Sequence, residues 1–377
     1  MSDLLDLGDM HVPEAGAGRD TVNDTFSDPV ACKLGFIGLG QGGSRQAEAF
    51  AKLGYGRVCV VNSTHQDLDG IQLPAECKLD LGTNGAGGDP AKGREAIAGR
   101  QEDVFALLKR SWGTDVDRAF ICFAGGGGTG AGTFPTVVDV VKQYATEHGR
   151  DIKVGVILIL PKDSEGMRSA KNACDAVREL ARIPALSPIV LVDNQRIEAL
   201  YPGMAIARFY GTANTTTAQL MHLFNRLAAK SSDMVTFDPA DLGVLLDSGL
   251  LVMGAQPIKP APGKAIDEAA VSTAIRQQLK ATVLADVDLT TGTHAGLVFV
   301  VGQALLDTLP QRVLDHGHET LSRMLPGVSL FRGIYPTGGD SVQAFTMIGG
   351  LKWPRTRIDS MARRAGLSPD AITTLLP

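Results

Sequence analysis

Residues 125–133 read Gly125-Gly126-Gly127-Gly128-Thr129-Gly130-Ala131-Gly132-Thr133 and follow an apolar run from Ala119 to Phe123. Six glycines in the eight residues 125–132 cost backbone entropy, which only a close approach of other groups to the backbone would justify. A helical pattern follows from Val137 to Glu147, so a flexible linker is the less favoured interpretation. The segment predicts a strand, a glycine loop and a helix whose N-terminus can hold an anion.

A second glycine loop, Gly38-Leu39-Gly40-Gln41-Gly42-Gly43-Ser44, also lies between a predicted strand and a predicted helix. Its glycines match the spacing of dinucleotide-binding oxidoreductases, which is a weak signal by itself. Those enzymes need an acidic residue at the end of the second strand to hold a ribose, and here Asn62 takes that place. The two loops therefore favour a polyphosphate held from two sides over a nicotinamide cofactor.

A third glycine segment, Gly85-Ala86-Gly87-Gly88-Asp89-Pro90, precedes Lys92-Gly93-Arg94. It could close over a terminal phosphate, because its glycines would let the backbone approach an anion. It could equally be a simple turn. The residues alone leave both interpretations open.

The apolar runs predict an α/β fold with a doubly wound parallel sheet, since continuous apolar strands alternate with helices. The strands of this sheet are expected at residues 34–37, 58–61, 119–123, 154–160 and 189–192. Helical spacing without strand signals runs from about 204 to 230. A second, smaller α/β domain is expected from strands at 250–253, 297–301, 328–331 and 342–347, with helices at 265–279 and 311–324.

Composition is ordinary for a globular protein, with 44% hydrophobic and 20% charged residues and a net charge of −5. No apolar run approaches the ~20 residues that span a bilayer, and no secretory signal precedes the fold, so we expect no membrane insertion. The five cysteines are scattered and form no CxxC pair. This usage favours reduced thiols and a cytoplasmic protein.

The segment Gly126–Gly132 resembles the GGGTG(S/T)G signature of the tubulin/FtsZ family and departs from it only at Ala131. The resemblance runs in order from about Lys33 to Gly254 and more loosely to about Gly350. It implies a GTP-binding domain, a long central helix and a smaller activation domain. It also implies GTP/GDP and Mg2+ as ligands, and a homo-polymer of head-to-tail protofilaments as the assembly.

The resemblance gives nucleotide-binding roles to the three glycine loops and to Asn62. The first loop would hold the diphosphate, with Gln41 near nucleotide-bound magnesium as the metal-site residue, and the third would sense the γ-phosphate. The residues implied are Gly38, Gly40, Gln41, Gly42, Gly43, Ser44, Asn62, Gly87, Gly88, Asp89, Gly126, Gly127, Gly128, Thr129 and Gly130.

Four further residues would complete the nucleotide site on the nucleoside side. Glu165 matches the acidic residue that holds the ribose, and Arg168 lies near the family's arginine, whose own place is taken by Ser169. Asn194 and Asn214 match two asparagines that select guanine, since an amide offers both a donor and an acceptor. Each asparagine taken alone would more often be a capping or surface residue.

The catalytic candidates are Asp238 and Asp241, which lie in a segment that resembles the family's NxDxxD synergy loop, with Thr236 in place of the usual asparagine. The resemblance implies that they reach the nucleotide of the next subunit and orient the attacking water. The same residues also predict a helix start, with Asp238 as N-cap, Pro239 at the first position and Asp241 closing a capping box. The two interpretations are compatible.

The domains are predicted as an acidic flexible arm (1–30), a GTP-binding domain (31–203), a central helix (204–232), an activation domain (233–350) and a basic C-terminal tail (351–377). The tail carries five basic residues against Asp359 and Asp370. It resembles a helix-turn-helix only faintly, so two short packing helices are the favoured interpretation. A tail that binds a neighbouring subunit, an adaptor or a DNA-binding partner is the middle possibility.

The favoured function is an assembly-stimulated GTPase that forms filaments. The absence of both a membrane-docking tail peptide and a long acidic tail favours the plasmid- and phage-encoded tubulins, which position DNA or phage particles. The alternatives are a cell-division FtsZ-like ring protein and a GTP-binding filament protein without efficient hydrolysis. The substitutions at Thr236 and Ser169 leave the last of these open.

Overall fold

The structure is a computed structural model that describes residues 23–26, 28–260, 262–280 and 285–376. The chain divides into two compact units. Among the described residues, the larger unit contains 23–26, 32–219 and 353–376, and the smaller unit contains 28–31 and 220–352. Most of the predicted acidic arm, residues 1–22, lies outside the described residues.

The larger unit is built on a six-stranded parallel sheet in the order β3-β2-β1-β4-β5-β6. The strands are β1 (Leu34–Leu39), β2 (Val58–Asn62), β3 (Lys78–Asp80), β4 (Arg118–Ala124), β5 (Lys153–Leu160) and β6 (Leu186–Asp193). Every residue of β1 and β2 is buried, as expected for strands covered on both faces. This sheet confirms the doubly wound parallel fold.

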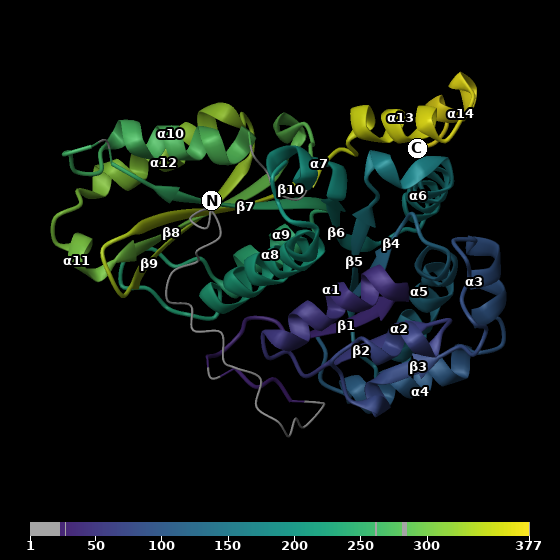
Figure 1. The fold of residues 1–377 in the computed structure, drawn as a ribbon. Helices are drawn as coiled ribbons and strands as arrows, with labels where there is room; N and C mark the ends of the chain where they lie inside the picture. The colour runs from purple at the N-terminus through teal and green to yellow at the C-terminus, as the bar shows by residue number, and fades with distance from the viewer. Residues whose placement is uncertain (1–22, 27, 261, 281–284, 377) are drawn as a thin grey trace. The chain divides into compact units, whose positions relative to one another are not determined.

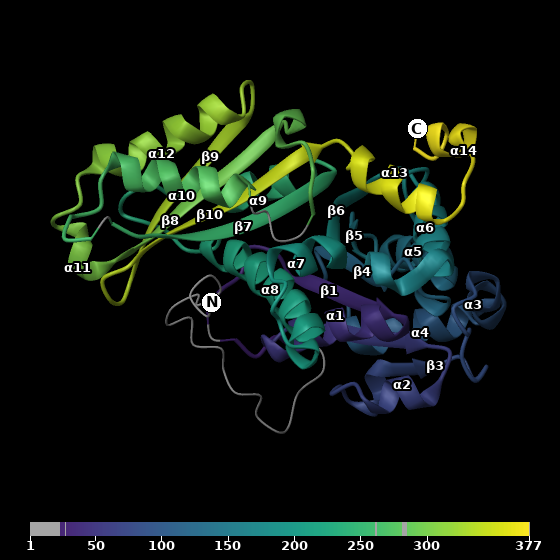
Figure 2. The same cartoon turned by 45° about the horizontal axis from the view of Figure 1, so that its top comes forward.

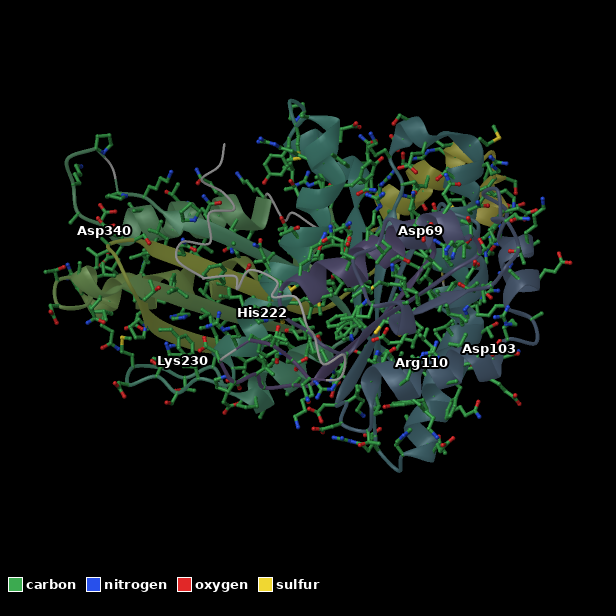
Figure 3. The ribbon with its side chains drawn as sticks, turned by 60° about the horizontal axis from the view of Figure 1, so that its bottom comes forward. Asp69, Asp103, Arg110, His222, Lys230 and Asp340 are labelled. Atoms are coloured by element: carbon green, nitrogen blue, oxygen red, sulfur yellow. The ribbon has the colours of Figure 1, made fainter. Side chains whose placement is uncertain are left out.

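Helices connect these strands and cover the sheet (Figure 1). They are α1 (Gly40–Lys52), α2 (His65–Asp69), α3 (Pro90–Ile97), α4 (Gln101–Trp112), α5 (Thr129–Glu147), α6 (Gly166–Leu180) and α7 (Asn194–Leu200), with short 3-10 turns η2 (Ala75–Cys77) and η3 (Asp163–Glu165). Asp103 and Arg110 of α4, which are labelled in Figure 3, are exposed, whereas Val104, Leu107 and Leu108 of the same helix are buried. Such one-sided burial is what an amphipathic covering helix requires.

The only strand of this sheet that the apolar pattern failed to predict is β3, an edge strand of three half-buried residues. Its sequence, Lys78-Leu79-Asp80, has a single apolar residue, so it gives no strand signal by itself.

The predicted arm also differs from expectation where it is described. Asp24 accepts hydrogen bonds from the Gly56 N–H (2.9 Å) and Arg57 Nη1 (2.9 Å), which fixes the chain just before β1.

The smaller unit has a mixed sheet in the order β7-β10-β8-β9, in which β10 runs antiparallel to both β7 and β8, while β8 and β9 are parallel. Its strands are β7 (Leu250–Ile258), β8 (His294–Gly302), β9 (Ser329–Thr337) and β10 (Val342–Leu351). Its helices are α9 (Pro239–Leu246), α10 (Glu268–Lys280), α11 (Gln303–Leu306) and α12 (Gln311–Met324), with the turn η4 (Leu289–Thr291). Helices α10 and α12 pack side by side (Figure 2).

The predicted central helix is α8 (Ile206–Leu227), and the boundary between the units falls within it, between Gln219 and Leu220. The chain returns to the larger unit at Trp353 and ends in α13 (Arg355–Arg364) and α14 (Pro369–Thr373). Gly366 (φ 71°) makes the turn between these two helices, and the Ser368 hydroxyl caps α14. Within the described residues, no helix is long and apolar enough to cross a membrane.

Two buried histidines in the smaller unit are held neutral by their surroundings. They are His318 of α12 and His222 of α8, which is labelled in Figure 3. Burial lowers the pKa of each to about 4. The ring of His318 meets Phe299 edge-on, with centroids 5.2 Å apart. An imidazole is protonated near pH 6.5 in an unfolded chain, so below that pH these residues favour unfolding.

We expect His318→Leu to make the protein less sensitive to acid. Between pH 7 and 4.5 the wild-type chain should lose about 2–3 kcal/mol of stability through this one group, because its folded pKa lies about two to three units below the unfolded value. Denaturant unfolding at the two pH values measures the difference. His316→Gln, on the same helix and partly exposed, is the control. Equal acid losses in His318→Leu and wild type would contradict the assignment.

Candidate nucleotide-binding site

A cavity of about 620 Å3 opens at the carboxyl ends of the parallel strands in the larger unit. Its lining begins where β1, β2, β4 and β6 end, at Gly40, Ser63, Gly126 and Asn194. Ligands of open α/β sheets bind at this edge, because loops and helix N-termini converge there. All of its lining residues fall between Leu39 and Asn214.

The three predicted glycine loops all reach this cavity. Most of the predicted nucleotide residues line it: Gly40, Gln41, Gly42, Gly87, Gly88, Gly126, Gly127, Gly128, Thr129, Gly130, Glu165, Asn194 and Asn214. The third loop, Gly85–Gly88, is therefore part of the site and is more than a surface turn. Six predicted residues do not line the cavity: Gly38, Gly43, Ser44, Asn62, Asp89 and Arg168.

Three residues of the first loop, Gly38, Gly43 and Ser44, do not line the cavity but pack the loop against its neighbours. A Cβ on Gly43 would lie 2.0 Å from the Cys122 carbonyl oxygen, so only glycine lets α1 pack this closely on β4. A Cβ on Gly38 would lie 2.5 Å from the Gly43 carbonyl oxygen. Ser44 is fully buried. These positions therefore serve the packing of helix on strand, while Gly40, Gln41 and Gly42 face the cavity.

The second and third loops touch each other through their backbones. A Cβ on Gly128 would lie 2.6 Å from the Asp89 nitrogen and 2.8 Å from the Ala86 Cβ, so a side chain there would push the loops apart. Asp89 accepts a hydrogen bond from the Ala91 N–H (2.9 Å) and caps α3. Its side chain thus fixes the end of the third loop. Arg168 lies beside this loop, with its guanidinium carbon 3.4 Å from the place of a Cβ on Gly88.

Asn172 of α6 joins the two loops by hydrogen bonds. Its amide Nδ2 donates to the carbonyl oxygens of Gly88 (2.8 Å) and Gly126 (3.1 Å), and the residue is 6% exposed. The sequence offered no signal for this residue, because it lies within an ordinary amphipathic helix and outside every glycine segment.

A cluster of polar side chains stands at the end of β2. Asp67 of α2 lines the cavity and accepts hydrogen bonds from Gln41 Nε2 (3.4 Å) and Asn62 Nδ2 (3.3 Å). Asn62 is 1% exposed and positions Asp67 from behind. Arg45 of α1 adds a positive charge to the lining. Neither Asp67 nor Arg45 was predicted, because Asp67 lies in the first turn of α2 and Arg45 in the second turn of α1, just beyond the segments that mark the loops.

The other end of the cavity is lined by Glu165, Asn194, Asn214 and Tyr210. Glu165 is held by the Lys162 N–H, which donates to its Oε1 (2.8 Å), and by the Ser169 hydroxyl, which donates to its Oε2 (3.4 Å). Asn194 is 5% exposed and begins α7, which Asp193 caps. Tyr210 of α8 is 41% exposed and presents a ring that the predictions did not include.

Residues 33–202 match the family model described as the GTPase domain of the tubulin/FtsZ family. The tubulin-like protein CetZ of Pyrococcus horikoshii is 27% identical to this chain over 328 residues, which cover 84% of each protein. By this domain match and this relative, the chain is similar to the tubulin/FtsZ family.

Other relatives and solved structures point to the same family fold. The tubulin-like protein TubZ of Bacillus cereus is 25% identical over 252 residues, covering 61% of this chain and 56% of that protein, so this chain matches little more than half of its length. A GTPγS-form protofilament of Bacillus thuringiensis serovar israelensis TubZ superposes with a TM-score of 0.77 at 20% identity, covering 90% of this chain and 92% of that chain.

Asp238 and Asp241, the predicted catalytic residues, lie in the smaller unit at the start of α9. The Asp238 carboxylate accepts from the N–H groups of Ala240 (2.8 Å) and Asp241 (2.9 Å), while Asp241 Oδ2 accepts from the Asp238 N–H (3.2 Å). This is the capping box that the sequence predicts. Burial and the neighbouring Asp238 charge raise the pKa of Asp241, with burial the larger cause.

We expect Asn172→Ala to weaken GTP binding more than GDP binding. The amide holds the Gly88 loop, which is predicted to sense the γ-phosphate, against the Gly126 loop, and two hydrogen bonds are lost together. At about 1 kcal/mol per bond, the loss of both bonds should raise the ratio of the dissociation constants of GTP and GDP about 30-fold. Competition binding against a fluorescent nucleotide measures both constants. Lys171→Ala, on the same helix but exposed, is the control. Equal weakening of GTP and GDP would contradict a role in holding the third loop.

Proposed function

We propose that this chain binds GTP and GDP in the cavity, hydrolyses GTP, and polymerises head to tail into filaments in the cytoplasm. The observation that carries the proposal is the set of three glycine loops that line one cavity within the family's GTPase domain. Backbone N–H groups at the starts of α1 and α5 suit a polyphosphate, because both helix dipoles point their positive ends toward it.

The nucleoside would occupy the end lined by Glu165, Asn194 and Asn214. A carboxylate can accept hydrogen bonds from ribose hydroxyls, and two amides can pair with the donor and acceptor edge of guanine. Tyr210 offers a ring face to the base. Arg168, beside Gly88, is proposed to lie near the γ-phosphate.

Magnesium is proposed to accompany the nucleotide near Gln41 and Asp67. These two side chains are hydrogen-bonded to each other and line the cavity, so oxygen donors are available there. Within the described residues no three His, Cys, Asp or Glu side chains gather as a metal cluster. This donor set fits magnesium, which is usually held by one or two side chains together with water and phosphate oxygens. When bound, the ion would neutralise charge on the β- and γ-phosphates.

We propose that Asp238 and Asp241 complete hydrolysis in trans, on the nucleotide of the next subunit. Phosphoryl transfer needs mainly positioning and charge stabilisation, so carboxylates that orient the attacking water suffice. The capping box supports this proposal, because it fixes both side chains to the backbone at a helix start. The raised pKa of Asp241 suits a group that accepts a proton from water.

The proposed cargo is DNA or phage particles, through an adaptor or a DNA-binding partner. The support is the resemblance to TubZ, including a solved structure described as a type III plasmid segregation TubZ. The basic C-terminal segment has fewer unpaired positive charges for binding such a partner than its sequence suggests. Arg357 and Arg364 pair with aspartates of the same unit, and Arg355 lies within 4.0 Å of Asp359. A cell-division ring protein remains the alternative, on the likeness to FtsZ 1 of Pyrococcus horikoshii.

The first test is phosphate release against protein concentration, with GTP and magnesium, alongside light scattering. A threshold concentration shared by turnover and scattering is the expected result, because a site completed between subunits needs the polymer. Turnover strictly proportional to concentration without scattering would mean that each subunit hydrolyses alone. Scattering without turnover would favour a filament protein that binds GTP without efficient hydrolysis.

We expect Asp238→Asn and Asp241→Asn to assemble with GTP but to lose turnover by at least about 100-fold, the usual effect of removing a general base. Asparagine keeps the capping hydrogen bonds, so α9 should remain intact. Phosphate release and sedimentation of polymer measure the two properties separately. Asp233→Asn, an exposed aspartate earlier in the same connection, is the control. Wild-type turnover in both variants would exclude these carboxylates from hydrolysis.

A further inference from the structure

The C-terminal helix α13 packs along α6 in the larger unit, and the two lie side by side in both ribbon views (Figures 1 and 2). This segment follows the whole smaller unit in the chain, yet it belongs to the unit that contains the cavity. Ile358, Met361 and Ala362 are its buried residues. The helix is therefore anchored by an apolar face, and its charged side chains have fixed neighbours.

Arg357 uses all three guanidinium nitrogens. Nε donates to Asp193 Oδ2 (2.9 Å), Nη1 donates to Asp163 Oδ1 (2.9 Å), and Nη2 donates to the Pro161 carbonyl oxygen (2.6 Å). The side chain is 10% exposed and that of Asp193 is 2% exposed. A buried bridge of this kind is rigid, because the guanidinium is planar and each acceptor fixes its orientation.

The acceptors of Arg357 belong to two segments that both line the cavity. Asp193 precedes Asn194 and caps α7, while Asp163 begins the turn η3, which ends at Glu165. Two further hydrogen bonds join the same segments, from the Asp163 N–H to Gln195 Oε1 (2.7 Å) and from Lys162 Nζ to Glu198 Oε1 (3.2 Å). One acceptor of Arg357, Asp193, is the residue next to Asn194 in the chain. Another, Asp163, is two residues before Glu165.

We propose that Arg357 is a positioning residue for the nucleoside half of the cavity: it holds the segments of Asn194 and Glu165 at a fixed separation. The recognition of guanine and ribose then depends on the C-terminal helix. This inference rests on the proposed function, namely that the cavity holds a guanine nucleotide.

Charge supports the same assignment. Asp193 is deeply buried, which raises its pKa, and the Arg357 guanidinium opposes this rise. Asp163 has a second partner in Arg364 Nη2 (2.8 Å), but that arginine is 50% exposed. Removal of Arg357 would leave a buried carboxylate beside Asn194 without its cation, which is costly in a site of low polarity. The Asp193 side chain would then shift or take up a proton, and the start of α7 would move with it.

The test compares nucleotide binding by Arg357→Ala, Arg357→Lys and wild type as full chains. We expect Arg357→Ala to weaken GTP and GDP by the same factor, about 10- to 100-fold, because hydrogen bonds to charged groups are lost at the nucleoside end only. The preference for GTP over ATP should fall as well. Arg357→Lys keeps the charge but bridges fewer acceptors, so it should show a smaller loss in the same direction.

The matched control is Arg355→Ala, an exposed arginine of the same helix, which should change these affinities less than about threefold. Thermal unfolding without nucleotide is measured on every variant. A lowered melting temperature with unchanged affinities and unchanged GTP preference would make Arg357 a structural anchor only and overturn the proposal. A larger loss for GTP than for GDP would also overturn it.

The same measurements distinguish a failure of the proposed function from a failure of the role of Arg357. If the wild-type chain binds neither GTP nor GDP, the proposed function itself fails. If wild type binds and Arg357→Ala binds equally well with equal selectivity, only the role of Arg357 fails. If Arg357→Ala does not fold, Arg357→Lys decides: an unchanged affinity and an unchanged preference for GTP would overturn the proposal.

Discussion

Contact between backbones, without intervening side chains, is the constraint on which the cavity depends. Gly43 lets α1 approach the carbonyl oxygen of Cys122, and Gly128 lets the second loop lie against the third. Helix starts and loop amides thereby converge at one edge of the sheet, where several N–H groups can donate hydrogen bonds to one anion. A methyl group at either position would separate elements that must touch, so the glycine content is a packing requirement before it is a binding one.

This constraint explains why so much of the fold and the site could be predicted from the sequence. Glycine clusters after apolar strands leave a visible pattern, and the strands themselves are continuous apolar runs because helices cover both faces. The pattern could not separate a glycine that faces a ligand from one that faces a helix. Gly38 and Gly43, for example, pack α1 closely on its neighbouring strands and do not line the cavity, and their role at the nucleotide stays a prediction. Asn62 and Asp89 likewise support residues that line the cavity.

The residues missed by sequence analysis share a physical reason. Asn172, Asp67 and Arg357 act through partners far away in the chain or beyond the end of a motif, and no local periodicity marks them. The basic tail illustrates the limit best. Its charge suggested an outward-facing surface, yet Arg357 and Arg364 turn inward to aspartates near the cavity. Net charge along a segment says nothing about which of its charges are already paired.

The start of α9 shows how one set of atoms can serve structure and chemistry together. Asp238 and Asp241 exchange hydrogen bonds with each other's backbone, so the helix end needs them even without any reaction. These bonds occupy one oxygen of each carboxylate and leave the other available to water. The side chains are consequently held still while remaining open to solvent, which is what a group that orients an attacking water requires. A capping box in this place therefore favours the proposed role in trans, because a neighbouring subunit would meet a preformed pair of carboxylates.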